Sequence, residues 1–394
     1  MPDTNNPELV LVTGVSGYLG SHVAQQLLAH GYRVRGTVRS SSNTDYINTL
    51  RELLTKGQSN TSIEFVEADL LNKTCWSAAV AGCDYICHVA SPFPLEVPSH
   101  ADELIAPAVD GTLAVLKAAA DSGTAKRVVL TSSLAAVHDV KLLGPDSDPN
   151  KVYNEEDWVD PDEVEPYSRS KILAEKAAMK FVEELPDPTD GKKKLELTVM
   201  NPSYIIGPMI TDRLSSSLIG IKRMLDKSSP AIPRLHLPFT DVRDVALAHV
   251  KALKLPGVVG KRYLLFSDCK WMKELAAIIA KEFKPLGYWV PSVVVPNTLV
   301  WLGSFFDRST VMVVPRLGRE FKLSNKRMIE ELGIEPIPVE QSIIDTCHSL
   351  IANNLVKPTR KYLKSREPSS GDTTNAPSSA AQSKDAQTET PNSN

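Results

Sequence analysis

The chain has 394 residues, of which 42% are hydrophobic and 23% charged, and its 44 basic and 47 acidic residues give a formal net charge of -3 at pH 7. This composition is typical of a globular protein and excludes disorder of the whole chain. Because basic residues are not in excess, nucleic acid is not expected as a partner.

The cysteines and the N-terminus predict a cytoplasmic protein. Five cysteines form an odd and sparse set, which favours a reducing compartment over a disulfide framework. The first seven residues lack the basic and apolar regions of a signal peptide. The most apolar segment, 289–306, is interrupted by Pro291 and Pro296, so no membrane span is expected.

Strand-like apolar runs alternate with helix-like spacings through the first half of the chain. The expected strands cover residues 9–13, 32–38, 63–66, 85–89, 127–131 and 195–200. The expected helices cover residues 21–30, 76–80, 104–120 and 167–184. This alternation predicts an α/β fold, a doubly wound parallel sheet with helices on both faces and ligands at the carboxyl ends of its strands.

The second half of the chain predicts a smaller C-terminal α/β lobe. Its expected elements are helices near 215–226, 242–253, 272–283 and 339–351 and a strand at 262–266. We expect a cofactor-binding domain over residues 8–202, with 238–266 packing back onto it, and a substrate-binding lobe over 203–356. Residues 364–394 contain no aromatic residue and no aliphatic residue larger than alanine, which predicts a disordered tail.

A glycine turn joins the first expected strand to the first expected helix, with the spacing GxxGxxG. Glycine allows a tight turn and the close approach of a pyrophosphate, while the helix N-terminus offers amides and the positive end of its dipole. The turn therefore predicts a Rossmann-type dinucleotide site, although its spacing differs from GxGxxG and a turn without a ligand is the alternative. The residues predicted to bind the cofactor are Gly14, Gly17, Tyr18, Leu19 and Gly20.

The ends of the next three expected strands carry further candidates. An acid at the end of the second strand would select NAD, but Arg39 stands there and favours NADP(H) over NAD(H), unless it is a surface arginine. Asp69 and Leu70 directly follow the third strand, where they are expected to contact the edge of the adenine ring. The alternative for Asp69 is that it caps a helix. The segment after the fourth strand is expected to line the ribose and nicotinamide, with Val89, Ala90 and Ser91.

Tyr167 and Lys171 lie four residues apart in an expected helix, which places them on one face. The positive charge of the lysine would lower the pKa of the tyrosine and make it an acid or base near neutrality. A solvated helix face is the alternative for such a pair. Thr131, Ser132 and Ser133 end the fifth strand at the same sheet edge, where a serine hydroxyl can bind a substrate carbonyl.

Together these motifs resemble the extended short-chain dehydrogenase/reductases of the epimerase/dehydratase superfamily. Within them the sequence is similar to the branch of dihydroflavonol 4-reductases, cinnamoyl-CoA reductases and fungal ketone and methylglyoxal reductases. The resemblance covers about residues 9–353 and rests on VTGVSGYLGSHV, RVRGTVRS, EADL, HVASPF, the residues 109–112, RVVLTSS, EEDW, YSRSK and NPSYIIGP.

The resemblance implies catalytic roles for Ser133, Tyr167 and Lys171. NADPH would deliver hydride to a carbonyl carbon, Tyr167 would protonate its oxygen, Ser133 would polarise the carbonyl, and Lys171 would hold the nicotinamide ribose. The resemblance also places Pro202, Ser203 and Tyr204 near the nicotinamide carboxamide. One departure is that residues 40–46 lack the second basic residue that plant members often have after the arginine.

Other residues are less specific. Phe93, His138 and Met209 are candidate substrate contacts. Packing in the core explains Phe93 and Met209 as well, and a loop histidine satisfied by hydrogen bonds is the alternative for His138. Cys83, Cys87 and His88 lie on or beside a buried strand without a second pair of ligands, so no metal site is expected.

The sequence thus predicts an NADPH-dependent carbonyl reductase that acts on a small-molecule aldehyde or ketone, as a monomer or homodimer. A 3β-hydroxysteroid dehydrogenase or a nucleotide-sugar epimerase or dehydratase is the alternative enzyme, because these share the fold and the YxxxK pair. A regulator that senses NADP(H) without turnover is the alternative of another class, disfavoured by the intact Ser133, Tyr167 and Lys171.

Overall fold

Seven parallel strands form the main sheet in the order β3-β2-β1-β4-β5-β6-β9. The structure is a computed structural model that describes residues 7–57, 63–91, 102–140, 148, 150–187, 194–305 and 313–366. The strands are β1 (Leu9–Val12), β2 (Arg33–Val38), β3 (Ile63–Glu67), β4 (Tyr85–His88), β5 (Arg127–Thr131), β6 (Glu196–Pro202) and β9 (Arg262–Leu265). The order reverses between β1 and β4, which is where such sheets bind ligands.

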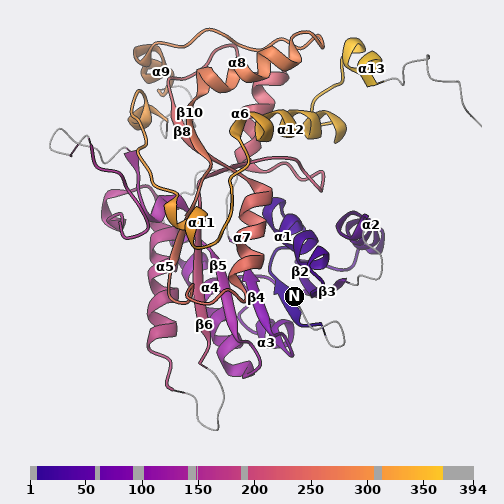
Figure 1. Ribbon diagram of the computed structural model, residues 1–394, viewed down its shortest axis with the longest axis vertical. Coiled ribbons are helices and arrows are strands. Elements are labelled where there is room, and N and C mark those ends of the chain that lie inside the picture. The colour runs from indigo at the N-terminus through magenta and orange to yellow at the C-terminus, as the bar shows by residue number, and fades with distance from the viewer. Residues whose placement is uncertain are drawn as a thin grey trace, which may run out of the picture.

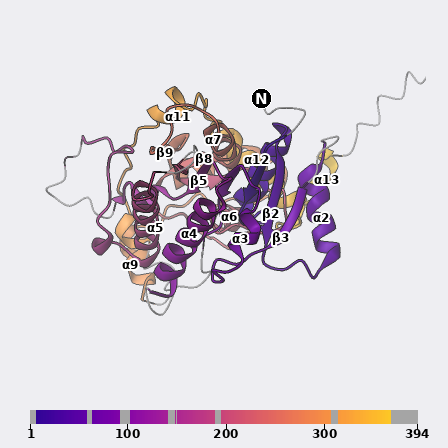
Figure 2. The same cartoon turned by 90° about the horizontal axis from the view of Figure 1, so that it is seen from below.

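Helices cover both faces of this sheet, which confirms the predicted doubly wound α/β fold (Figure 1). One face carries α1 (Tyr18–Ala29), α2 (Thr44–Thr55) and α7 (Val242–Ala252). The other, seen clearly in Figure 2, carries α3 (Trp76–Val80), α4 (Asp102–Ser122) and α5 (Pro166–Glu183).

The central strand β1 explains why residues 9–12 are all apolar. Its four residues are all buried, with Val10 and Val12 in the core under α1 and α7 and Leu9 and Leu11 in the core under α3 and α4. A strand covered on both faces keeps no polar side.

A second, three-stranded sheet in the order β10-β8-β7 belongs to the smaller lobe at the top of Figure 1. Its strands are β7 (Tyr204–Ile206), β8 (His236–Asp241) and β10 (Asp268–Trp271). The helices α6 (Ser216–Leu225), α8 (Met272–Phe283) and α12 (Val339–Ala352) pack around a core that includes Phe239, Ile279 and Ile343. Shorter helices are α9 (Asn297–Gly303), α11 (Lys326–Glu330) and α13 (Arg360–Arg366).

The chain crosses between the lobes more than once. After β7, α6 and β8 in the smaller lobe, α7 and β9 return to the main sheet, and β10 then lies in the smaller one. Within the segment 238–266, which was expected to pack back on the first domain, residues 238–241 therefore belong to the second sheet.

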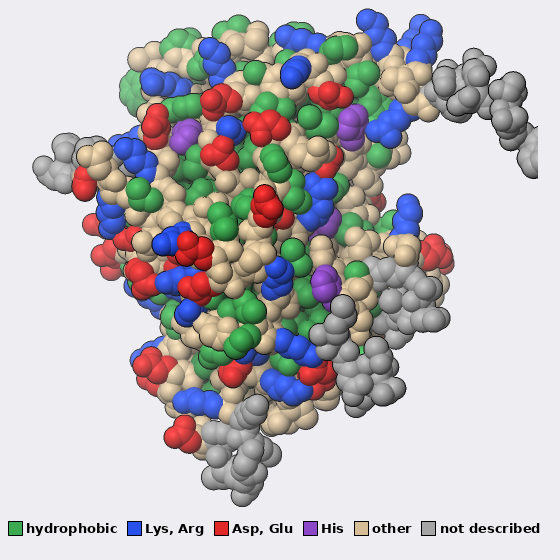
Figure 3. Space-filling model, viewed as in Figure 1, with side chains coloured by type: hydrophobic (Ala, Val, Ile, Leu, Met, Phe, Trp, Pro, Cys, Tyr) green, Lys and Arg blue, Asp and Glu red, His purple; other side chains and the backbone are tan. Residues whose placement is uncertain are grey.

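Several elements were not among those expected from the sequence, including the strands β7, β8 and β10 and the helices α9 and α11. Helix α2 was not predicted, and α13 extends to Arg366, within the segment predicted as tail. Residues 367–394 lie outside the described residues. No helix in the described ranges is long and apolar enough to span a bilayer. Acidic and basic side chains are interspersed over the described part of the face in Figure 3, in keeping with the net charge of -3.

We expect Leu27→Ala to lower the free energy of unfolding by about 2–5 kcal/mol, because it leaves a cavity in the core under α1. Leu27 is fully buried there. Leu363 on α13 is 51% exposed, so Leu363→Ala is the matched control and should change stability by less than about 0.5 kcal/mol. Urea-unfolding midpoints measure both effects, and equal shifts would contradict the described core.

Candidate active site

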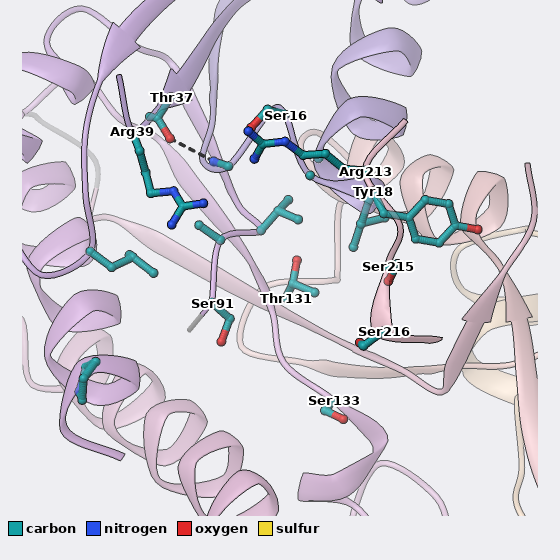
Figure 4. A pocket seen from close by; sticks show the side chains of 18 of the residues that line it. Ser16, Tyr18, Thr37, Arg39, Ser91, Thr131, Ser133, Arg213, Ser215 and Ser216 are labelled. Atoms are coloured by element: carbon teal, nitrogen blue, oxygen red, sulfur yellow. Dashed lines mark hydrogen bonds between the residues drawn. The ribbon is translucent and has the colours of Figure 1, made fainter. Parts of the chain in front are cut away.

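A cavity of about 740 Å³ lies at the carboxyl ends of the main-sheet strands, between the two lobes (Figure 4). Its walls come from the glycine turn, the ends of β2 to β6, helix α5 and the loop before α6. The predicted residues that line it are Gly14, Gly17, Tyr18, Leu19, Gly20, Arg39, Asp69, Leu70, Val89, Ala90, Ser91, Ser133, Tyr167, Lys171, Pro202 and Ser203. The structure thus brings together candidates spread over about half of the sequence.

The glycine turn is held in a conformation that side chains would not allow. Gly14 has φ +67°, and a Cβ atom on Gly20 would collide with the carbonyl of Gly14. The backbone N–H of Gly14 donates to Thr37 Oγ1 at 2.9 Å, a bond visible in Figure 4. The turn is therefore fixed against β2 and brings its backbone to the cavity.

The N-terminus of α1 is available to an anion. Gly17 is the N-cap residue, so no side chain caps the helix, and its first turn contains no acidic residue. The helix dipole and the first amides are consequently not neutralised locally, which suits a pyrophosphate. Across the cavity, the buried hydroxyl of Ser203 has no hydrogen-bond partner among the described residues. Both observations fit a dinucleotide.

Thr13 aligns the segment after β4 with the glycine turn. Its Oγ1 accepts hydrogen bonds from the backbone N–H groups of Val89 at 3.0 Å and Ala90 at 2.9 Å. The ring of His88 bonds the same oxygen at 2.9 Å. These contacts hold Val89, Ala90 and Ser91 at the cavity wall. Asp69 also lines the cavity, where its Oδ1 accepts from the backbone N–H of Leu71 at 2.8 Å and closes a local turn.

Ser133, Tyr167 and Lys171 meet at the same wall. The hydroxyls of Ser133 and Tyr167 are hydrogen-bonded to each other. Lys171 Nζ lies 5.9 Å from the centre of the Tyr167 ring and donates to Ser91 Oγ at 2.9 Å. A half-buried hydroxyl pair next to a buried amine can bind a carbonyl oxygen and give it a proton.

Burial determines the charges of this group. It raises the pKa of Tyr167, with a smaller increase from Glu165, and these outweigh the lowering by the hydrogen bond with Ser133. Burial also lowers the pKa of Lys171 to about 8, although Glu175 acts in the opposite direction. The spacing predicted a Tyr167 pKa below its usual value, but the net shift is upward, because desolvation is the largest effect on this group.

A buried ion pair lies next to the cavity wall that carries Ser133, Tyr167 and Lys171. Arg262 Nε donates to Glu175 Oε1 at 2.5 Å, and the two side chains are 5% and 0% exposed. Glu175 also accepts from the hydroxyl of Ser132 and, at 2.8 Å, from Nδ2 of Asn201. The same Asn201 nitrogen donates to the carbonyl oxygen of Ser133 at 3.1 Å. Sequence reasoning missed this network, although Lys171 and Glu175 are again four residues apart.

Several candidates lie elsewhere. Tyr204 does not line the cavity, and its ring packs edge-on against that of Phe239 with the ring centres 5.5 Å apart. Side chains alternate along a strand, and the neighbouring Ser203 and Ile205 are the residues that face the cavity. His138 is buried and stacks on Tyr153 at 3.7 Å, and Met209 is buried in the core of the smaller lobe. Neither lines the cavity. Phe93 lies outside the described residues.

The cavity also contains residues that sequence reasoning missed. They are Ser16, Thr37, Val38, Ala68, Leu71, Trp76, Glu103, Pro107, Ile205, Arg213, Leu214, Ser215 and Ser216. Thr131 and Ser132, which the sequence analysis named together with Ser133, line the cavity too. Arg213, Leu214 and Ser215 come from the loop before α6 and Ser216 is the first residue of that helix, and no local pattern indicates that this segment lies at the cavity. Within the described ranges, no three His, Cys, Asp or Glu side chains gather as a metal site would require.

The sequence matches the family described as NAD dependent epimerase/dehydratase over residues 10–265. Cinnamoyl-CoA reductase 1 of Arabidopsis thaliana is 34% identical over 346 residues, which cover 86% of this chain and 88% of that protein. The crystal structure of Gre2 from Candida albicans with NADPH has a TM-score of 0.69 and 30% identity, covering 88% of this chain and 99% of that one. Yeast methylglyoxal/isovaleraldehyde reductase Gre2, complexed with NADPH, has a TM-score of 0.69 and 26% identity over 88% and 99% of the two chains.

Replacing Glu175 by alanine is expected to lower the free energy of unfolding by about 3–5 kcal/mol, because Arg262 would remain buried without its carboxylate. Arg262→Met should cost a similar amount, and the double variant should lose less than the sum. The control is the exposed pair Lys73 and Asp110, with side chains 63% and 52% exposed, where loss of either partner should cost about 0–1 kcal/mol. Strictly additive losses at 175 and 262 in urea unfolding would refute a direct coupling.

Proposed function

The chain belongs to the NAD dependent epimerase/dehydratase family and is an oxidoreductase, and on this premise we propose that it is an NADPH-dependent reductase of aldehyde or ketone groups. The observation that carries the proposal is the hydrogen-bonded pair of Ser133 and Tyr167, with Lys171 beside it, on the wall of the cavity that also contains the glycine turn. This arrangement puts a proton donor next to a dinucleotide site.

NADPH, when bound, supplies the hydride that converts the carbonyl carbon to an alcohol carbon. The chain's own residues would hold it along the whole cavity. The glycine turn and the N-terminus of α1 would bind the pyrophosphate, and Arg39 would pair with the 2′-phosphate. Lys171 would bond the nicotinamide ribose, and the unpartnered hydroxyl of Ser203 is suited to the carboxamide.

Tyr167 would provide the proton. Its raised pKa keeps the phenol protonated at neutral pH, so that it can donate to the carbonyl oxygen. Ser133 would bond the same oxygen and then stabilise the phenolate, since its hydrogen bond already acts to lower the tyrosine pKa. Lys171, with a pKa of about 8, still carries its proton at pH 7 and would add a positive charge nearby.

The substrate would be a carbonyl compound of small or moderate size. The names of the relatives support this choice, because one acts on cinnamoyl-CoA and another on methylglyoxal and isovaleraldehyde. A regulator without turnover would have no use for the pairing of Ser133 and Tyr167. A nucleotide sugar or a steroid is the alternative substrate class within the same family.

We expect Tyr167→Phe to lower kcat for NADPH-dependent carbonyl reduction by about 10²- to 10⁴-fold, because the proton donor is lost. The dissociation constant for NADPH should change little. The measurement is the loss of NADPH absorbance with a panel of aldehydes, diketones, aromatic ketones, a cinnamoyl thioester, a ketosteroid and a nucleotide sugar. Tyr288→Phe, in the smaller lobe, is the matched control and should keep full activity.

Two results would contradict the proposal. Undiminished turnover by Tyr167→Phe would remove Tyr167 from the reaction. Tight NADPH binding without reduction of any carbonyl compound in the panel would favour the sensor, or an epimerase or dehydratase where the nucleotide sugar alone is converted. Reduction of the ketosteroid alone would keep the proposal and assign the substrate to the steroid class.

A further inference from the structure

The cavity contains two arginines that come from different lobes. Arg39 follows β2 of the main sheet, and Arg213 lies in the loop between β7 and α6 of the smaller lobe. Figure 4 shows them extending into the cavity from opposite sides, with the guanidinium group of Arg213 toward Ser16 of the glycine turn. Because the two arginines are far apart in the sequence, the sequence alone does not indicate that they share a cavity.

Arg39 is the one positively charged residue of the segment 39–46. Residues 40–46 contain no lysine or arginine. The nearby hydroxyls are engaged elsewhere, because Ser40 and Ser42 bond each other at 2.8 Å and Ser41 Oγ donates to Glu67 at 2.7 Å. A phosphate monoester carries a charge of about -1.5 to -2 at pH 7, so one arginine would not neutralise it.

Arg213 is held where it can supply the second charge. Its guanidinium carbon lies 5.4 Å from the centre of the Tyr46 ring, on the first turns of α2. This cation–π contact directs the side chain toward the side of the cavity where β2 ends. The described residues provide no carboxylate that forms an ion pair with Arg213, so its charge is not neutralised locally.

We propose that Arg213 is the second cation of the cofactor's 2′-phosphate site and thereby determines the preference for NADP(H) over NAD(H). The inference rests on the proposed function, since it assumes a nicotinamide dinucleotide in this cavity. Two planar guanidinium groups can each form paired hydrogen bonds with phosphate oxygens. The N-terminus of α1 would already bind the pyrophosphate, so we assign Arg213 to the phosphate on the adenosine ribose. The 2′-phosphate site is then completed only by both lobes together.

The test compares dinucleotides with and without the 2′-phosphate, using wild type, Arg213→Ala and Arg213→Lys. Isothermal titration gives dissociation constants for NADP⁺ and NAD⁺, and for adenosine 2′,5′-bisphosphate and 5′-ADP, which lack the nicotinamide and report binding alone. Arg213→Ala should weaken NADP⁺ and the bisphosphate by about 10- to 100-fold and change NAD⁺ and 5′-ADP little. Arg213→Lys should recover part of the loss, because it restores the charge without the planar fork.

The matched control is Arg223→Ala, which removes an exposed arginine of α6 outside the cavity lining and should leave all four affinities unchanged. Equal weakening of NADP⁺ and NAD⁺ by Arg213→Ala would overturn the inference and assign Arg213 to the pyrophosphate. Unchanged NADP⁺ affinity in that variant, with carbonyl reduction by the wild type intact, would overturn the inference alone. A wild-type protein that binds neither dinucleotide would overturn the proposed function as well.

Discussion

One buried carboxylate, that of Glu175, holds the face of α5 that carries Tyr167 and Lys171 against the main sheet. A charge without water must be paired and hydrogen-bonded, and Glu175 meets this requirement with Arg262 of β9, Ser132 at the end of β5 and Asn201 of β6. Three strands and one helix are therefore fixed relative to one another at this point. Because Lys171 and Tyr167 lie one and two turns before Glu175, their positions at the cavity follow from the same anchor.

The topology of the sheet explains how distant segments form one cavity. Parallel strands bring their carboxyl ends to one edge, and the reversal of order between β1 and β4 opens a space there. The smaller lobe closes this space because the chain crosses to it after β6 and returns with α7 and β9. Arg213 reaches the glycine turn by this route, so the loop before α6 belongs to the same site as residues near the N-terminus.

Local patterns predicted the parts of the site that depend on local structure. The strands, the glycine turn and the Tyr167 and Lys171 spacing follow from periodicity and backbone requirements that the sequence states directly. Helix α2 was missed although Ile47, Leu50 and Leu54 have helical spacing and Asn43 caps its first turn. By contrast, Arg213 could not have been placed at the cavity, because its position depends on how the lobes pack.

The differences between expectation and structure have physical causes too. Tyr204 belongs to a strand whose alternation faces it away from the cavity, and His138 is held by stacking on Tyr153, so neither lines the cavity and their predicted roles remain untested. Tyr204 was assigned by resemblance to a family and His138 by its place after the fifth strand, whereas tertiary packing determines where both side chains lie. The error in the pKa of Tyr167 has the same origin, since the spacing reveals a nearby lysine but not the extent of burial.

Burial of Tyr167 and Lys171 also bears on how the proposed reaction would proceed. Desolvation disfavours the phenolate and the ammonium group alike, which raises one pKa and lowers the other. Once the phenol gives up its proton, the phenolate and the ammonium become an ion pair in a medium of low dielectric, where their attraction is stronger than in water. The surroundings that make Tyr167 hold its proton at rest would thus strengthen the interaction that compensates for its loss. In the proposed reaction this coupling would give Lys171 a second role besides binding the ribose, because its charge would stabilise the phenolate left when the proton is transferred.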